Sequence, residues 1–119
     1  MATVLVVDDD PEIRRMIGRL LEHEGFQIRS AGDGEEALRL CQAHLPDAIV
    51  ADLMMPRLDG EAFLMELSER YPDHRISVVL LTASALRKEV AGRLGVAASL
   101  AKPFDTTQLV DLMLELTAR

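Results

Sequence analysis

Hydrophobic residues along this chain follow two different spacings, which alternate from one end to the other. Short segments, most of them unbroken hydrophobic runs, predict strands at residues 3–7, 27–31, 48–51, 77–81 and 99–101. Between these segments hydrophobic residues recur every three or four positions, the spacing of a helix that buries one face. Each predicted strand is therefore followed by a predicted helix.

Residues that start or stop helices delimit the helical segments. Asp10 followed by Pro11 is a typical start, since aspartate caps the first turn and proline fits its first position. Gly25 ends this first helix, and Pro46 follows the second. The hydrophobic faces of the predicted helices span residues 13–21, 37–41, 63–67, 86–94 and 109–116.

The alternation of strands and helices predicts the α/β class. Parallel strands need long crossovers, which helices provide, so we expect a doubly wound sheet of five parallel strands with five helices on both faces. The run at residues 48–51 is hydrophobic throughout, as is typical of a strand covered on both sides. Sandwich and barrel folds are excluded, because helices and not hairpin turns separate the strands.

Composition narrows the class of protein. The chain has 119 residues, the size of one domain, and 49% of them are hydrophobic, enough for a compact core. A formal net charge of −7 argues against direct binding of nucleic acid, which needs a basic surface.

Cys41 is the only cysteine, so no intrachain disulfide can form and a reducing compartment is expected. No signal peptide or membrane span is recognisable, so we expect a cytoplasmic protein that does not enter a membrane.

Polar residues follow four of the predicted strands: Asp8 and Asp9, Asp52, Thr82 and Lys102. Ligands of open α/β sheets bind beyond the carboxyl ends of the strands, so these side chains are expected to meet. Three carboxylates in one crevice repel one another, and a hard divalent ion such as Mg²⁺ relieves the repulsion. The ion would also let an anionic phosphoryl group enter. Asp52, which ends the strand that looks most buried, is the best candidate for a nucleophile that forms an acyl phosphate.

Four segments, taken together and in this order, resemble the signature of the receiver domain of two-component response regulators. They are VVDDDP from residue 6, DLMMPRLDG from residue 52, LTA from residue 81 and AKPF from residue 101. The resemblance covers essentially the whole chain, so residues 1–119 are expected to form a single receiver domain. It also implies the flavodoxin-like strand order 2-1-3-4-5.

The resemblance implies a role for each residue at the strand ends. Asp52 would be the phosphoacceptor, and Asp8 and Asp9 the acidic pair that binds Mg²⁺, with Mn²⁺ as the alternative ion. Asp52 and the backbone carbonyl of Met54 would complete the protein ligands of the metal.

Two further residues match the parts of a receiver that contact the phosphoryl group. Thr82 matches the switch hydroxyl and Lys102 the lysine that neutralises phosphoryl charge. The implied donor is a phosphohistidine on a sensor histidine kinase or a histidine phosphotransfer protein. The domain would support its own phosphorylation and slow dephosphorylation without being an enzyme, and would signal to a downstream target.

The chain departs from the receiver pattern at two places. Ser99 stands where receivers commonly carry an aromatic residue, and the interval from Thr82 to Lys102 is shorter than usual, so the fourth helix or the loop before it is expected to be trimmed. These departures keep an alternative open, a pseudo-receiver that retains the fold as an interaction module and takes no phosphoryl group.

Enzymes and cofactor carriers on similar sheets fit the sequence less well. Flavin-type phosphate loops are rich in Ser, Thr and Gly, whereas the first loop here is acidic. Phosphatases of the dehalogenase kind share the spacing of Asp8 and Asp10, but Pro11 and Glu12 break the rest of that motif. No phosphate-binding glycine loop of the nucleotide-hydrolase type is present.

Several other polar residues have a structural explanation. Asp10 is expected mainly as a helix cap, Cys41 as a small packed residue, and Arg14 and Arg15 on a solvated helix face. The histidines lack a shared metal-binding spacing and are expected at the surface: His23, His44 and His74.

Overall fold

The computed structural model describes residues 2–52, 60–82, 97–101 and 104–118. Its centre is a sheet of five strands in the order β2-β1-β3-β4-β5, and every neighbouring pair is parallel. The strands are β1 (Thr3–Val7), β2 (Gln27–Ala31), β3 (Ala48–Asp52), β4 (Ser77–Thr82) and β5 (Ala98–Ala101). The predicted fold class and strand order are confirmed.

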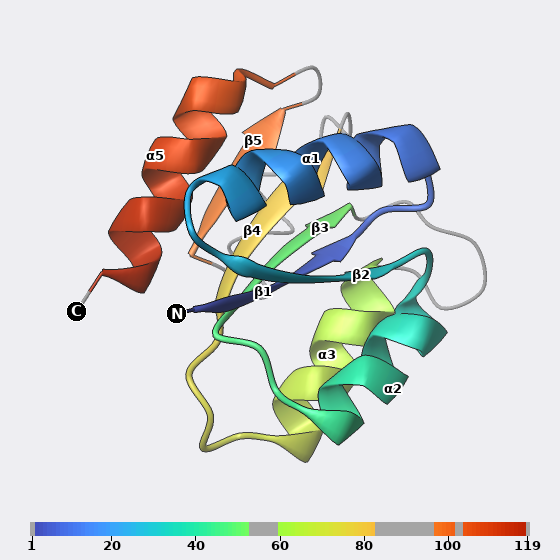
Figure 1. Cartoon of the computed structure of the whole chain (residues 1–119). Coiled ribbons are helices and arrows are strands. Elements are labelled where there is room, and N and C mark those ends of the chain that lie inside the picture. The colour runs from blue at the N-terminus through green and yellow to red at the C-terminus, as the bar shows by residue number, and fades with distance from the viewer. Residues whose placement is uncertain (1, 53–59, 83–96, 102–103, 119) are drawn as a thin grey trace.

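Helices cover both faces of the sheet (Figure 1). One face carries α1 (Pro11–His23) and α5 (Thr106–Thr117), and the other carries α2 (Gly34–Ala43) and α3 (Gly60–Arg70). The structure therefore describes four of the five predicted helices. The fourth predicted helix, at residues 86–94, lies outside the described residues.

Two hydrophobic clusters, one on each face, join the helices to the sheet. Alternate residues of β1 supply both: Val4 and Val6 belong to the cluster under α1 and α5, and Leu5 and Val7 to the cluster under α2 and α3. Every residue of β1 and of β3 is buried, which explains why both read as unbroken runs in the sequence. Burying a Val or Leu side chain contributes roughly 1.5–3 kcal/mol, so these two strands anchor the fold.

Aspartates fix the starts of three helices. Asp10 caps α1, and its side chain accepts a hydrogen bond from the backbone N–H of Glu12 at 2.9 Å. Asp33 and Asp105 cap α2 and α5 in the same way. The cap predicted at Asp10 is confirmed. Gly25 follows α1 with a φ of 99°, a conformation that glycine adopts without strain.

The strand ends differ slightly from the predicted ones, in a way that matters for the site. The third strand extends to Asp52 and the fourth to Thr82, so each of these residues is the last of its strand. No helix in the described ranges is long and apolar enough to cross a membrane.

Candidate functional site

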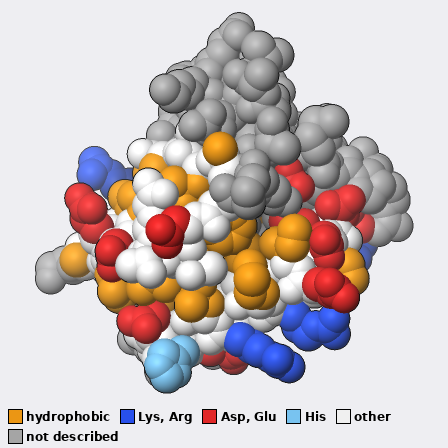
Figure 2. Space-filling view, turned by 90° about the horizontal axis from the view of Figure 1, so that it is seen from above, with side chains coloured by type: hydrophobic (Ala, Val, Ile, Leu, Met, Phe, Trp, Pro, Cys, Tyr) orange, Lys and Arg blue, Asp and Glu red, His pale blue; other side chains and the backbone are white. Residues whose placement is uncertain are grey.

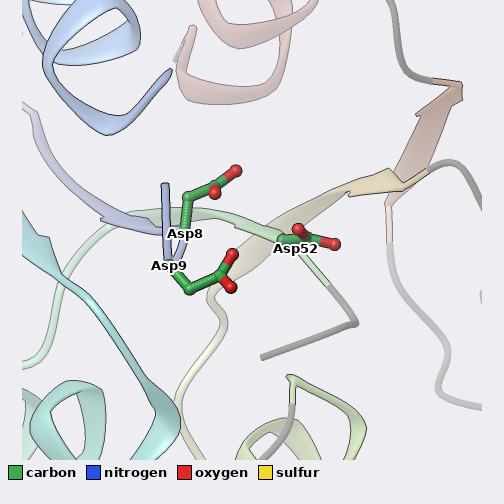
Figure 3. A group of neighbouring side chains, drawn as sticks. All are labelled: Asp8, Asp9 and Asp52. Carbon is green, nitrogen blue, oxygen red and sulfur yellow. The ribbon is translucent and has the colours of Figure 1, made fainter. Parts of the chain in front are cut away.

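Three carboxylates meet at the carboxyl ends of the two central strands. Val7 of β1 pairs with Ala51 of β3, so the residues that follow, Asp8 and Asp52, leave the sheet next to each other. Asp8, Asp9 and Asp52 each offer a carboxylate oxygen, and these oxygens all lie within 4.8 Å of one another. Figure 3 shows Asp8 and Asp9 at the end of β1, beside Asp52 at the end of β3. The meeting of these three side chains follows the sequence-based expectation.

The three carboxylates differ in exposure. Asp8 is 1% exposed and Asp52 is 7% exposed, whereas Asp9 lies at the surface. Asp9 is therefore the most solvent-exposed member of the group.

Backbone contacts hold Asp8 in place. Its N–H donates to the carbonyl of Ala31 at 3.1 Å, which ties the end of β1 to the end of β2. Its carboxylate oxygen Oδ1 accepts the N–H of Asp10 at 2.9 Å, which shapes the turn into α1. Arg14, in the first turns of α1, donates from Nη1 to the carbonyl oxygen of Asp8 at 2.7 Å.

The expectation that Arg14 lies on a solvated face is wrong. Arg14 is half-buried and its guanidinium contacts the backbone of the site, whereas Arg15 is exposed as expected. The helical spacing could have indicated that Arg14 lies on the buried side of α1, because it stands three, four and seven positions before the buried residues Ile17, Gly18 and Leu21.

The donor set suits a hard divalent cation. All three side chains supply oxygen, and two like charges about 4 Å apart repel by roughly 4 kcal/mol at an effective dielectric constant of 20. Octahedral Mg²⁺ holds its oxygen ligands roughly 3–4 Å apart, which is compatible with this cluster. Within the described ranges, this is the only group of histidine, cysteine or acidic residues close enough to hold a metal ion.

The other predicted site residues are only partly covered by the structure. Asp52 pairs with Leu81, so Thr82, the last residue of β4, lies one position beyond Asp52 on the neighbouring strand. Met54 and Lys102 lie outside the described residues. Ser99 is half-buried in β5 and pairs with Leu80.

The remaining candidates have structural roles. His23, His44 and His74 are exposed, and the ring of His74 packs edge-on against Tyr71 at 6.1 Å. Cys41 is 1% exposed, and burial raises the pKa of its thiol from 9.0 to about 11. Its expected place in the core is confirmed.

Comparison with known proteins decides the family. The family model for the response regulator receiver domain matches residues 4–114. The chain belongs to this family. In this receiver domain, three aspartates lie together at the carboxyl ends of β1 and β3 (Figure 3).

Curated relatives are response regulators of about twice the length. Response regulator Rre1 from Synechocystis sp. is 37% identical over 120 residues, a match that covers 98% of this chain and 52% of the relative. Response regulator MprA from Mycolicibacterium vanbaalenii is 39% identical over 118 residues, covering 98% of this chain and 50% of the relative. The chain thus spans about half the length of these relatives.

Solved receiver domains have the same fold. The receiver domain of the Francisella response regulator 1452 is 35% identical, with a TM-score of 0.88 over 98% of this chain and 96% of that one. The chemotaxis protein CheY4 of Vibrio cholerae is 30% identical, with a TM-score of 0.88 over 98% of both chains.

Proposed function

We propose that residues 1–119 form a single receiver domain that takes a phosphoryl group onto Asp52 in a Mg²⁺-dependent reaction. The donor is a phosphohistidine on a sensor histidine kinase or a histidine phosphotransfer protein. The observation that carries this proposal is the cluster of Asp8, Asp9 and Asp52, whose carboxylate oxygens lie within 4.8 Å of one another.

Asp52 is the proposed nucleophile because of how the cluster is built. The Asp8 carboxylate already shapes the turn into α1 through its bond to Asp10, so moving it would disturb the helix start. Asp9 is exposed, and its acyl phosphate would have little shelter from water. Asp52 ends a fully buried central strand and lies 7% exposed beside both other carboxylates.

The transfer is a displacement at phosphorus. A carboxylate oxygen of Asp52 forms the new P–O bond while the P–N bond to the donor imidazole breaks, and the electron pair stays on that nitrogen. Water later reverses the modification by releasing inorganic phosphate and restoring the carboxylate. The domain thus acts as a phosphoacceptor that supports its own slow dephosphorylation, without turning over a separate substrate.

Metal binding would be shared among Asp8, Asp9, Asp52 and the backbone carbonyl of Met54. A bound Mg²⁺, or Mn²⁺ in its place, supplies compensation for the negative charge of carboxylates and phosphoryl oxygens. Asp8 and Asp9 would orient that charge beside Asp52. This assignment is consistent with the all-oxygen donor set and the spacing of the three carboxylates.

Thr82 and Lys102 would respond to the phosphoryl group. The Thr82 hydroxyl would donate to a phosphoryl oxygen, and the Lys102 ammonium would pair with its charge. The added charge would shift a two-state equilibrium of the output surface, as phosphorylation does in other switches. Ser99 is smaller than the aromatic residue common at its position, so the response is expected to use other residues.

We also propose that the domain works in the cytoplasm. The cytoplasm is reducing and would keep Cys41, the only cysteine, as a free thiol.

Seen from above, from the side of α1 and α5, acidic side chains are spread among the described residues and Lys and Arg lie towards the rim (Figure 2). We therefore propose a protein as the downstream target of this domain, with no direct contact to nucleic acid.

A mass measurement tests the proposal. Wild-type protein incubated with acetyl phosphate and Mg²⁺ should gain one phosphoryl group, and both EDTA and the Asp52→Asn substitution should abolish the gain. The result that contradicts the proposal is a folded, Mg²⁺-binding wild-type domain that no acetyl phosphate or phosphohistidine protein labels. That outcome would identify a pseudo-receiver.

A further inference from the structure

Arg14 touches the site through the backbone and not through a carboxylate. Its Nη1 donates to the carbonyl oxygen of Asp8 at 2.7 Å, in a half-buried setting. This carbonyl belongs to the peptide group that joins Asp8 to Asp9. The hydrogen bond therefore fixes the plane of the link between two of the three clustered aspartates.

The peptide plane matters because the rest of Asp8 is already held. The N–H of Asp8 is bonded to Ala31, and its carboxylate accepts the N–H of Asp10. Rotation about the Cα–C bond of Asp8 would swing Asp9 relative to Asp8 and would also pull the Asp10 N–H away from the Asp8 carboxylate, so the Arg14 and Asp10 bonds restrain the same rotation. Asp9 is exposed, so packing restrains its direction little.

The guanidinium of Arg14 also lies against the turn between β2 and α2. A methyl group built on Gly32 would come within 3.2 Å of Arg14 Nη1, closer than side chains ordinarily pack. Glu36 stabilises the same turn, since its Oε1 accepts the N–H of Gly32 at 2.7 Å. Arg14 is thus confined between the Asp8 carbonyl and the Gly32 backbone.

We propose that Arg14 is a positioning residue for the metal site, which orients Asp9 by holding the Asp8–Asp9 peptide. This inference rests on the proposed function, because it presumes that Asp8 and Asp9 bind Mg²⁺. Residues that orient metal ligands typically change metal affinity by roughly 10- to 100-fold when they are replaced.

The charge of Arg14 and its hydrogen bond to Asp8 should affect Mg²⁺ binding in opposite directions. A guanidinium beside the site repels a divalent cation, so removing its charge alone should strengthen Mg²⁺ binding. Losing the positioning bond should weaken Mg²⁺ binding. The two explanations of the same substitution therefore predict opposite signs.

Arg15 offers a matched control for the loss of charge. It neighbours Arg14 on α1, is exposed, and makes no ion pair or side-chain hydrogen bond within the described part of the chain. Arg15→Gln removes the same charge from the same helix and leaves the bond to Asp8 intact. Its Mg²⁺ affinity should change less than about twofold, towards tighter binding.

The experiment is a Mg²⁺ titration of the apo domain, followed by the backbone amide signals of the β1–α1 turn. Arg14→Gln should raise the Kd for Mg²⁺ by roughly tenfold. Arg14→Lys, which keeps the charge and one donor, should fall between Arg14→Gln and wild type. Thermal unfolding of each variant shows whether it is folded at the titration temperature.

A second variant keeps the test decisive if Arg14→Gln does not fold. Gly32→Ala leaves every charge in place and pushes a methyl group against the guanidinium, so it should weaken Mg²⁺ binding in the same direction. Unchanged or tighter Mg²⁺ binding by folded Arg14→Gln, or by Gly32→Ala where the former is unfolded, would overturn the inference. Labelling of wild-type protein by acetyl phosphate tests the proposed function separately, since it does not depend on Arg14.

Discussion

Val7 in β1 pairs with Ala51 in β3, and this register brings Asp8 and Asp52 side by side. The pairing is between the two central strands of the sheet, whose residues are buried on both faces. The backbone positions of Asp8 and Asp52 therefore depend on the pairing of two strands that are anchored in the hydrophobic core. Substitutions at the site should test its chemistry without dismantling the fold.

Replacing Asp52 should stabilise the domain when no divalent ion is present. Asp52→Asn removes one of three clustered negative charges, so the free energy of unfolding without Mg²⁺ should rise by about 1 kcal/mol. Wild type should gain about 1.4 kcal/mol at a Mg²⁺ concentration ten times its Kd, and the variant much less at that concentration. Thermal unfolding with and without MgCl₂ measures both effects. An equal response to Mg²⁺ in the two proteins would argue against Asp52 as a metal ligand.

The neighbours Asp9 and Asp10 should separate metal binding from helix capping. Asp9→Asn should weaken Mg²⁺ binding at least about tenfold with little loss of stability, because Asp9 is exposed. Asp10→Ala should cost about 1 kcal/mol of stability and leave the Mg²⁺ affinity nearly unchanged, because its side chain caps α1. Urea unfolding and Mg²⁺ titration of both variants give the comparison. A reversed pattern would mean that the two residues exchange the roles assigned to them.

Cys41 should make stability fall at alkaline pH. Burial raises the pKa of its thiol from 9.0 to about 11, so between these values the unfolded chain loses a proton that the folded chain keeps. The unfolded state then binds fewer protons, and the free energy of unfolding decreases as pH rises from 9 to 11. The loss relative to Cys41→Ala should approach roughly 2–3 kcal/mol by pH 11.

Urea unfolding at a series of pH values measures that difference. Cys41→Ala is the control, because it differs from wild type only at the thiol and keeps every other titratable group. The native thiol should also react slowly with iodoacetamide, since Cys41 is 1% exposed. Parallel stability curves for the two proteins from pH 9 to 11 would show that the thiol titrates normally.

Adjacent residues of α5 should differ widely in their contribution to stability. Met113 is fully buried, so Met113→Ala should cost roughly 2–5 kcal/mol. Leu114 is 42% exposed, so Leu114→Ala should cost less than about 1 kcal/mol. Denaturant unfolding of the two variants makes the comparison. Similar losses would mean that α5 packs on the sheet through a different face.

Local patterns in the sequence were sufficient to predict the α/β class because they agree with the core, whereas the strand order was implied by the resemblance to receiver domains. Strands β1 and β3 are buried on both faces and read as unbroken hydrophobic runs, while buried residues of α1 recur at helical spacing. Strand register was not readable from these patterns, since it depends on contacts between distant segments. The meeting of Asp8 and Asp52 was therefore an expectation from topology, which the structure bears out.

The contact made by Arg14 shows what the sequence did not reveal. The hydrophobic period of α1 placed Arg14 on the buried side of the helix, but two adjacent arginines favoured a solvated face. Only the path of the turn after β1 brings the Asp8 carbonyl within 2.7 Å of the guanidinium. The roles of Thr82, Lys102 and Met54 stay predictions.

The interior place of β1 in the sheet constrains how the chain can fold during synthesis. β1 is made first, yet its two neighbours are the strands Gln27–Ala31 and Ala48–Asp52. β4 and β5 then add one after the other to the same growing side of the sheet. A nascent chain that has emerged from the ribosome only as far as Asp52 would therefore carry three paired strands, with the outer edge of β3 still open. Such open edges favour association between chains, so the period before β4 leaves the ribosome is when this domain most needs protection from its neighbours.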